Sequence, residues 1–400
     1  MKIRIKRKSL FIFSYLIAML WLFMFYNRDV FFNINNYRNL LFFIVGYGLL
    51  LVIFKMFKNK RLLGIPSVLI ILCWTVLLNS KYILRKKAEP YYIMFIVALL
   101  LYLLCMAELE FDIYIIRFLV NAYILSAVIM SVIILVQHKT PYAQYGIFRW
   151  ALFYGQNEYY DVNFTSLYLL MPAILSFYGA VSAKNQNRWK YMICVGLILL
   201  AIMMLGSRGT FAPVIAIMAF LVLKGKKISM PKILTIIVFV VAVFFLLPED
   251  TFSRLIGTRY IGSESKRYID WAYGMKVFSN SPIWGNGMRA PKVLVNEIGG
   301  GVMNYTIHNT YVVYLAQLGI VGSIPFFGLL VYPILYLIKK NRDLCLILMY
   351  FGILFAAMMI EANYSYVLFV PLSIFYMFIS FIKRNEIKNS LLEYIFKEID

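Results

Sequence analysis

The feature that most constrains this chain is a succession of long apolar runs separated by short polar segments, most of them basic. A helix needs ~20 residues, and at least ~17, to cross the hydrocarbon core of a bilayer, which is about 30 Å thick. Runs of this length recur along the whole sequence. We therefore predict an all-α polytopic membrane protein in which residues 1–400 form a single integral membrane domain with about 12 transmembrane helices. The predicted spans are 10–26, 40–57, 62–78, 91–107, 113–136, 164–181, 191–206, 210–223, 233–247, 318–338, 344–360 and 366–382.

The charge distribution predicts how these spans are oriented. The formal net charge is +22, although only 14% of the residues are charged. In a soluble protein this excess would suggest a nucleic-acid partner. Here most Lys and Arg residues lie in short loops, where they set topology, so we expect no nucleic acid. The positive-inside rule places both termini on the cytoplasmic side of the inner (cytoplasmic) membrane. Two segments disagree: basic KYILRKK (81–87) falls outside and acidic AELEFD (107–112) falls inside.

Two predicted outer loops are long. The first covers residues 137–163, and the second, at 248–317, is rich in charged residues, glycine and aromatics. Loops of such length in compact proteins are usually functional, so we expect the active site on the outer face, with the larger loop catalytic. The cytoplasmic tail, 383–400, has apolar residues at helical spacing, which predicts an amphipathic helix on the inner leaflet. These residues are Ile387, Leu391, Leu392, Ile395, Phe396 and Ile399.

An arginine interrupts the apolar stretch from Tyr191 to Leu223. As one helix this stretch would be about 50 Å long, which is too long for a single crossing. Because basic segments flank both ends, the chain must leave the cytoplasmic side and return to it. This predicts a turn from Gly206 to Gly209 that carries Arg208 to the outer interface. In the alternative interpretation, the arginine of this turn only reaches for lipid headgroups.

A second basic segment lies in the large outer loop. Residues 265–288 predict a short amphipathic helix that starts near Arg267 and is followed by a turn rich in proline and glycine. The glycines of this turn do not form a dinucleotide-binding motif, because no strand precedes them. Lys266 and Arg267 fit a binding surface and an ordinary solvated helix edge equally well.

The third piece is His308, one of only two histidines in the chain. It precedes an apolar helix in which Gly319 and Gly322 are expected to allow close helix packing. A lone histidine at an interface can be a structural hydrogen-bond donor. It can also exchange a proton near neutral pH, which would suit catalysis.

We expect Arg208, Arg267 and His308 to face one outer cavity. Arginine side chains bind phosphate oxygens through two parallel hydrogen bonds and stay charged. The set therefore suits a substrate with an anionic diphosphate leaving group and a hydroxyl nucleophile. The outer loops contain no Asp-x-Asp motif, and the chain has no Cys-x-x-Cys motif or Cys/His cluster. We thus expect no metal, disulfide or cofactor, and the arginines must supply the electrostatic stabilisation.

These pieces together resemble the O-antigen ligase and Wzy-type polysaccharide polymerase family. The resemblance rests on GSRGT between two short spans, on KRYIDWAYGMKVFSNSPIWGNGM, and on HNTYVVYLAQLGIVG at the end of the large outer loop. It covers residues 150–340. The first outer loop, FRWALFYGQNEYYDVN, is similar to a family region with an arginine followed by Asn-Pro-Asn. The Asn-Pro-Asn itself is absent, which leaves open whether Arg149, Asn157 or Asn163 has a role.

The resemblance implies a GT-C-like, metal-independent, inverting glycosyltransferase that uses a polyprenyl-diphosphate-linked sugar donor. It implies that Arg208 and Arg267 bind the diphosphate and that His308 activates or positions the acceptor hydroxyl. Arg149, Lys266, Asn309 and Tyr311 are candidates for supporting roles.

Two activities share these motifs. A polymerase joins capsular, exopolysaccharide or O-antigen repeat units by transfer to another lipid-linked unit, while a ligase moves the glycan to a different acceptor. We prefer the polymerase, because the sequence is rich in Lys, Ile, Asn, Phe and Tyr, which fits an AT-rich genome and a monoderm capsule producer. A flippase or transporter is a less favoured alternative, since few ionisable residues lie mid-span. The expected partners are a polyprenyl-diphosphate-linked oligosaccharide, membrane lipid, a chain-length regulator and a repeat-unit flippase.

Overall fold

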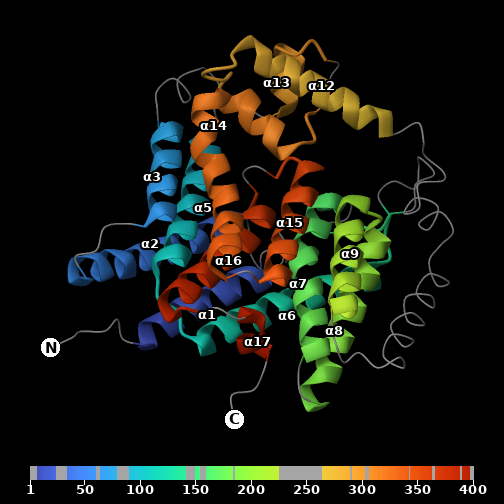
Figure 1. Ribbon diagram of the computed structural model, residues 1–400. Coiled ribbons are helices and arrows are strands. Elements are labelled where there is room, and N and C mark those ends of the chain that lie inside the picture. Colours follow the sequence, from blue (N-terminus) through green and yellow to red (C-terminus); the bar gives the residue numbers. More distant parts are fainter. Residues whose placement is uncertain are drawn as a thin grey trace.

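The protein is a bundle of helices with a small helical cap at one end, formed by the helices Glu264–Asn280 and Pro291–Glu297, as the computed structural model shows (Figure 1). The structure describes residues 7–23, 34–59, 64–78, 90–140, 149–153, 159–182, 185–224, 264–288, 291–301, 306–341, 343–362, 365–387 and 390–396. Within these ranges the regular structure is helical, apart from one isolated β-bridge between Phe153 and Tyr159. The predicted span 233–247 and the basic segment 81–87 lie outside the described residues.

The described helices coincide with every predicted span that falls within these ranges. They are α1 (Arg7–Phe23), α2 (Ile34–Asn59), α3 (Ile65–Leu78), α5 (Pro90–Glu108), α6 (Ile113–Gln137), α7 (Val162–Ser182), α8 (Asn185–Leu205), α9 (Arg208–Lys224), α12 (Glu264–Asn280), α13 (Pro291–Glu297), α14 (Thr310–Tyr336), the π-helical η2 (Leu337–Asn341), α15 (Leu344–Met358), α16 (Tyr366–Asn385) and α17 (Leu391–Phe396). Among the described helices, six are long and apolar enough to cross a membrane and five more are apolar but shorter. The protein is thus an all-α, multi-pass membrane protein.

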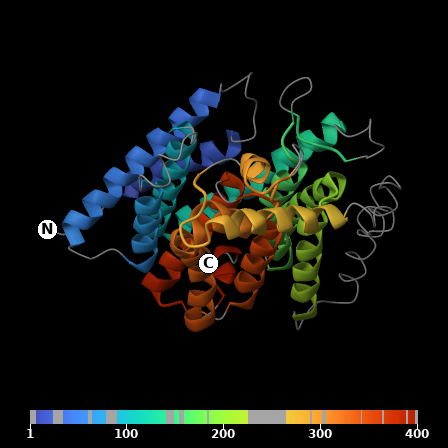
Figure 2. The same ribbon diagram turned by 90° about the horizontal axis from the view of Figure 1, so that it is seen from above.

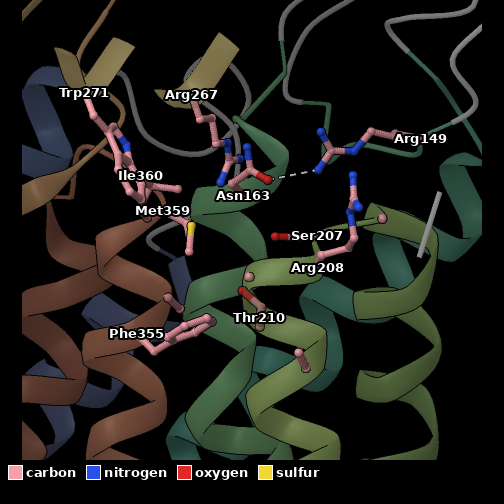
Figure 3. Close-up of a pocket in the computed structure, with 14 residues that line it drawn as sticks. Arg149, Asn163, Ser207, Arg208, Thr210, Arg267, Trp271, Phe355, Met359 and Ile360 are labelled. Carbon is pink, nitrogen blue, oxygen red and sulfur yellow. Dashed lines mark hydrogen bonds between the residues drawn. The ribbon is translucent and has the colours of Figure 1, made fainter. Parts of the chain in front are cut away.

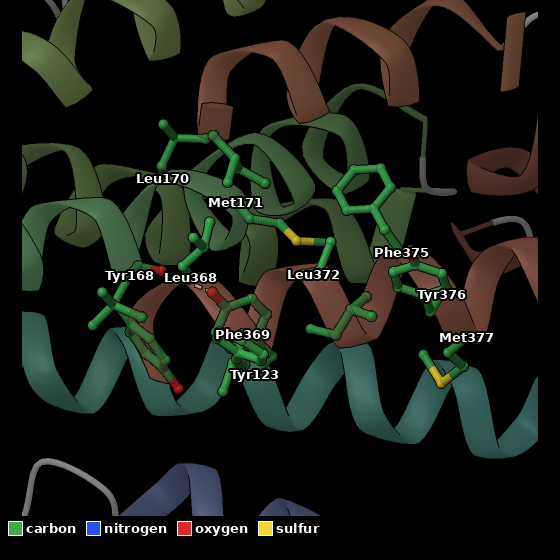
Figure 4. Close-up of a cluster of buried hydrophobic side chains, with 14 of the residues drawn as sticks. Tyr123, Tyr168, Leu170, Met171, Leu368, Phe369, Leu372, Phe375, Tyr376 and Met377 are labelled. Atoms are coloured by element: carbon green, nitrogen blue, oxygen red, sulfur yellow. Dashed lines mark hydrogen bonds between the residues drawn. The ribbon is translucent and has the colours of Figure 1, made fainter. Parts of the chain in front are cut away.

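Two helices form the centre of the bundle. In α7 and in α16, 83% of the apolar window is buried inside the protein, whereas the value for α2 is 28%, so α2 lies at the periphery. Figure 4 shows the buried side chains where these two helices meet. Three hydroxyl groups here have hydrogen-bond partners within the protein, which an apolar surrounding favours. The Tyr123 hydroxyl donates to the carbonyl of Tyr168 at 3.0 Å, and the Ser126 and Tyr168 hydroxyls lie 3.0 Å apart.

The acidic segment AELEFD forms ion pairs with basic residues of two other helices. Its negative charge is the opposite of what the positive-inside rule expects on that side of the membrane. Glu108 and Glu110 lie 3.6 and 3.5 Å from the ammonium group of Lys55 on α2. Glu110 also lies 3.8 Å from the guanidinium group of Arg384 on α16. The Ser67 hydroxyl of α3 donates to Glu108. The segment therefore ties four helices together at this end of the bundle, which accounts for its charge without changing the predicted topology.

The amphipathic tail has protein partners. Leu391, Leu392, Ile395 and Phe396 are buried. The Phe396 ring lies 5.8 Å from that of Tyr178 on α7 and 5.3 Å from that of Tyr191 on α8. The expectation that this helix lies on the inner leaflet is wrong for residues 391–396, because their apolar face packs on the bundle. Ile399 lies outside the described residues.

The helix that follows His308 is broken at Gly319, where φ is 66° and ψ is −173°. The turn 282–287 fills the break with its backbone. The N–H groups of Asn286, Gly287 and Ile320 donate to the carbonyls of Ala316, Gln317 and Pro282 at 3.0, 2.9 and 2.8 Å. A Cβ atom on Gly319 would lie 2.4 Å from the nitrogen of Gly285. The prediction of helix–helix packing at Gly319 is therefore wrong, since this glycine admits the backbone of a turn instead.

Candidate active site

The predicted turn between α8 and α9 is present and has the geometry of a helix end followed at once by a helix start. Gly206 has a φ of 61°, and its N–H donates to the carbonyl of Met203 at 2.9 Å. The Ser207 carbonyl accepts from the N–H groups of Thr210 and Phe211, so α9 begins at Arg208. N–H groups in the first turn of a helix lack partners within the helix and favour bound anions. The turn thus presents a guanidinium group beside a helix N-terminus.

A second arginine is held against this turn by a segment that precedes α7. The Trp150 N–H donates to the Met204 carbonyl at 3.0 Å, which aligns residues 149–152 with the end of α8. Arg149 is only 7% exposed. Its Nε donates to the Leu205 carbonyl at 2.7 Å, and one Nη donates to the Asn163 side-chain oxygen at 3.0 Å. These contacts orient its guanidinium group toward the space above the turn.

The third arginine comes from α12, which lies across the end of the bundle, from α14 toward α8 and α9 (Figure 2). Arg267 and Trp271 are four residues apart and therefore share one face of this helix. Gly274, seven residues after Arg267, lies on the same face, and a Cβ there would lie 2.7 Å from Val312 and 2.8 Å from Ile307. Gly274 therefore lets this face of α12 sit directly on the start of α14, while Arg267, nearer the N-terminus of α12, lies toward α9 (Figure 2).

The three arginines line one cavity of about 540 Å³. Figure 3 shows their guanidinium groups turned toward the same space beside Asn163. Ser207, Gly209 and Thr210 of the α9 N-terminus line it as well, and no described lining residue is acidic. The opposite wall is apolar and is formed largely by α15. It consists of Phe355, Ala356, Met359 and Ile360. The cavity thus combines a strongly cationic side with an apolar side.

His308 is not among the residues that line this cavity, so the structure does not bring it together with Arg208 and Arg267 there. It stands directly behind the wall. Its carbonyl accepts from the Trp271 indole at 3.2 Å, and its N–H donates to the Glu361 carboxylate at 2.8 Å. Trp271 and Ile360, the neighbour of Glu361, both line the cavity. The backbone of His308 is therefore bonded to one residue of the wall and to the neighbour of another.

Glu361 determines the conformation of that loop. One carboxylate oxygen accepts from the Thr306 hydroxyl, from the Ile307 N–H at 2.7 Å and from the His308 N–H at 2.8 Å. The loop is bent at His308, where φ is 46°, a left-handed conformation that non-glycine residues rarely adopt. Three donors on one anionic oxygen compensate for this unfavourable backbone conformation.

The residues predicted to support the site are partly outside the described structure, and those within it bond to the backbone of α14 and α15. The Asn309 side chain caps α14 by accepting from the N–H groups of Tyr311 and Val312 at 3.0 and 3.2 Å. The Tyr311 hydroxyl donates to the carbonyl of Leu354 at 2.7 Å and ties α14 to α15. Both contacts are structural. The side chain of Lys266 and the whole of Asn157 lie outside the described residues.

Sequence reasoning missed Glu361 and Trp271. Trp271 could have been found from its spacing, because a residue four positions after Arg267 lies on the same face of a helix. Glu361 carried a weaker signal, as an acidic residue at the end of an apolar span. Among the described residues, no group of three or more His, Cys, Asp or Glu side chains is placed to hold a metal ion.

Residues 192–327 match the family model described as O-antigen ligase. The matched region contains the α8–α9 turn with Arg208, helix α12 with Arg267, and His308 with the first part of α14. No curated protein matches the chain. The match supports the resemblance of this part of the chain to the O-antigen ligase and Wzy-type polymerase family.

Proposed function

We propose that the protein polymerises capsular, exopolysaccharide or O-antigen repeat units by transferring a glycan from a polyprenyl diphosphate to a hydroxyl group of another lipid-linked repeat unit. The observation that carries this proposal is the convergence of Arg149, Arg208 and Arg267, from three distant segments, on one cavity at a helix N-terminus. A diphosphate is the anion that such a site suits best, because it offers several oxygens to several guanidinium groups.

The proposed reaction forms one bond and breaks one bond at the anomeric carbon of the donor sugar. The acceptor oxygen attacks this carbon opposite the leaving group, and the bond from the carbon to the diphosphate oxygen breaks. The configuration is therefore inverted. The arginines and the α9 N-terminus stabilise the negative charge that develops on the departing polyprenyl diphosphate. The acceptor proton passes to the His308 imidazole, which a shift of its loop brings within reach.

The apolar wall supports the lipid part of the donor. Phe355, Met359 and Ile360 face the same cavity as the arginines, so a diphosphate held by the cationic side places its first isoprene units against this wall. Such a division of one cavity between charge and hydrocarbon suits an amphiphile with an anionic headgroup. It does not require a metal ion, because three fixed positive charges already face the headgroup.

The site lies at the end of the bundle that α12 covers, whereas α17, which follows the basic last turn of α16 with Lys383 and Arg384, lies at the opposite end (Figure 1). By the positive-inside rule the basic end is cytoplasmic, so the cavity opens on the outer face of the inner membrane. A cavity at this end, rather than at the midplane, favours transfer over transport through the bundle. A chain-length regulator and a repeat-unit flippase are the partners that such a polymerase would need.

The test uses purified protein with a polyprenyl-diphosphate-linked repeat unit. We expect a ladder of lipid-linked products, and we expect Arg208→Lys and Arg267→Lys to lose at least about tenfold in turnover, because lysine cannot form the two-pronged contact. Arg188→Lys is the matched control, since Arg188 lies near the other end of α8 and lines no described cavity. Full activity in both cavity variants would refute the proposal.

The same experiment distinguishes a polymerase from a ligase. Ligase activity is the alternative because the matched family model is described as O-antigen ligase. With a donor alone, only a polymerase extends the lipid-linked chain. Product that appears only after addition of a different glycan acceptor, in a single transfer without a ladder, would assign the ligase activity instead.

A further inference from the structure

A row of exposed apolar side chains runs along the part of α14 that follows the break at Gly319 and continues into η2. Ile320, Ile324, Val331, Leu335 and Ile338 are between 45% and 60% exposed. Their spacing of three, four and seven residues places them on one face of the helix. A candidate membrane span includes this whole stretch, so the row faces lipid.

The length of this row fits the thickness of the hydrocarbon core. From Ile320 to Ile338 the helix rises about 27 Å at 1.5 Å per residue, close to the ~30 Å of a bilayer core. At its lower end the row is followed by the exposed Lys339 and Lys340, which suit a headgroup region. Ile320 is therefore at the opposite boundary between hydrocarbon and headgroups.

The turn 282–284 extends this lipid-facing surface beyond Ile320. The N–H groups of Ile320 and Val321 donate to the carbonyls of Pro282 and Ile283 at 2.8 and 3.2 Å. These bonds hold the turn against the first residues of the span. Ile283 is 54% exposed and Trp284 is 47% exposed, so two large apolar side chains continue the row.

We propose that Ile283 and Trp284 anchor the cap in the membrane interface, with lipid as their partner. Tryptophan is enriched at this depth because its indole is apolar but also donates a hydrogen bond. The anchor keeps the start of α14 and the attached α12 at headgroup level. This also sets the depth of Arg267, since the same turn follows α12 directly. The inference depends on α14 as a membrane span and not on the reaction proposed above.

Gly285 and Asn286, which follow the anchor, explain why it is rigidly coupled to the span. Gly285 has a φ of 71°, and a Cβ there would lie 2.2 Å from the Gln317 carbonyl oxygen. The Asn286 side chain donates to the carbonyls of Val277 and Ala316 at 2.7 and 3.0 Å. The Asn286 amide thus joins the end of α12 to α14, so a displacement of the turn would move both helices.

The experiment places one nitroxide label at a time on the full chain in liposomes, in a Cys194→Ser background because the other three cysteines are buried. The labelled variants are Trp284→Cys, Ile324→Cys as a lipid-facing reference and Ser279→Cys as an exposed position on α12. Collision with oxygen, which partitions into lipid, is compared with collision with a water-soluble nickel chelate. We expect position 284 to favour oxygen at least about threefold more than position 279 does, and less than position 324.

Retention of a single monodisperse species and of the wild-type melting temperature shows that each labelled protein is folded. A label at position 284 that is as accessible to the nickel chelate as one at position 279 overturns the anchor. So does an immobilised spectrum at position 284 with spin–spin broadening between molecules, which would identify a second copy of the chain as the partner. Both outcomes leave the proposed glycan transfer untouched.

Discussion

Glu361 offers the sharpest test of how the cap positions His308. Its carboxylate oxygen accepts from Thr306, Ile307 and His308. Hydrogen bonds to a charged group contribute about 1.5–3 kcal/mol when buried. Because Glu361 is only partly buried, we take about 1 kcal/mol for each donor, or roughly 3 kcal/mol in total. The left-handed backbone at His308 opposes this by about 1–2 kcal/mol.

Glu361→Ala removes all three contacts. A loss of roughly 3 kcal/mol lowers the population of the native loop by up to about 100-fold, since each 1.4 kcal/mol is a factor of ten. We expect turnover to fall by a factor of this order. The affinity for the lipid diphosphate should change by less than about threefold, because Arg149 is held by other contacts. Glu361→Gln keeps an acceptor oxygen but loses the charge, so we expect about a tenfold loss.

The assay measures single-turnover transfer and donor binding on the same preparations. Glu386→Gln is the matched control, because Glu386 is an exposed glutamate at the other end of the bundle. Wild-type turnover in Glu361→Ala would show that the loop contacts do not position a catalytic group. A parallel loss of donor affinity and turnover would show instead that Glu361 shapes the diphosphate site.

Gly285→Ala should lower the free energy of unfolding by about 2–4 kcal/mol, because of the left-handed backbone and the overlap with Gln317. The control Gly46→Ala, with no neighbour within 4 Å of the added Cβ, should be neutral or stabilising by up to about 1 kcal/mol. Thermal unfolding in detergent compares the two variants, and equal melting temperatures would contradict the close packing of Gly285 on α14. Asn163→Ala removes one hydrogen-bond acceptor of Arg149, so the affinity for the donor should fall about fivefold to tenfold. The melting temperature should stay within a few degrees of the wild-type value. Unchanged affinity would exclude Arg149 from the diphosphate site. Turnover should persist after dialysis against EDTA, and a loss that a divalent ion restores would reveal a metal site.

Local patterns in the sequence were sufficient to predict the spans and the turn that carries Arg208. A span is determined by the length of an apolar run, and the basic segments on both sides of 191–223 leave only an out-and-back path. Helix α12 was predicted for the same reason, because helical periodicity is visible within about 17 residues. These features depend on neighbours in the chain, and neighbours are what a single sequence displays.

Contacts between distant segments were decided by the tertiary structure alone. Arg149 reaches the carbonyl of Leu205 across 56 positions of sequence, and Glu361 accepts from His308 across 53. Neither pairing leaves a periodic trace, because any carboxylate or guanidinium group on a loop would look the same. The sequence around Gly319 likewise does not show whether this glycine packs against another helix or against the backbone of a turn. The sequence by itself determined which residues lie near the ends of the spans. The packing of α12 on α14 decided which of them share a cavity, because the close approach of two helices depends on where glycine leaves room.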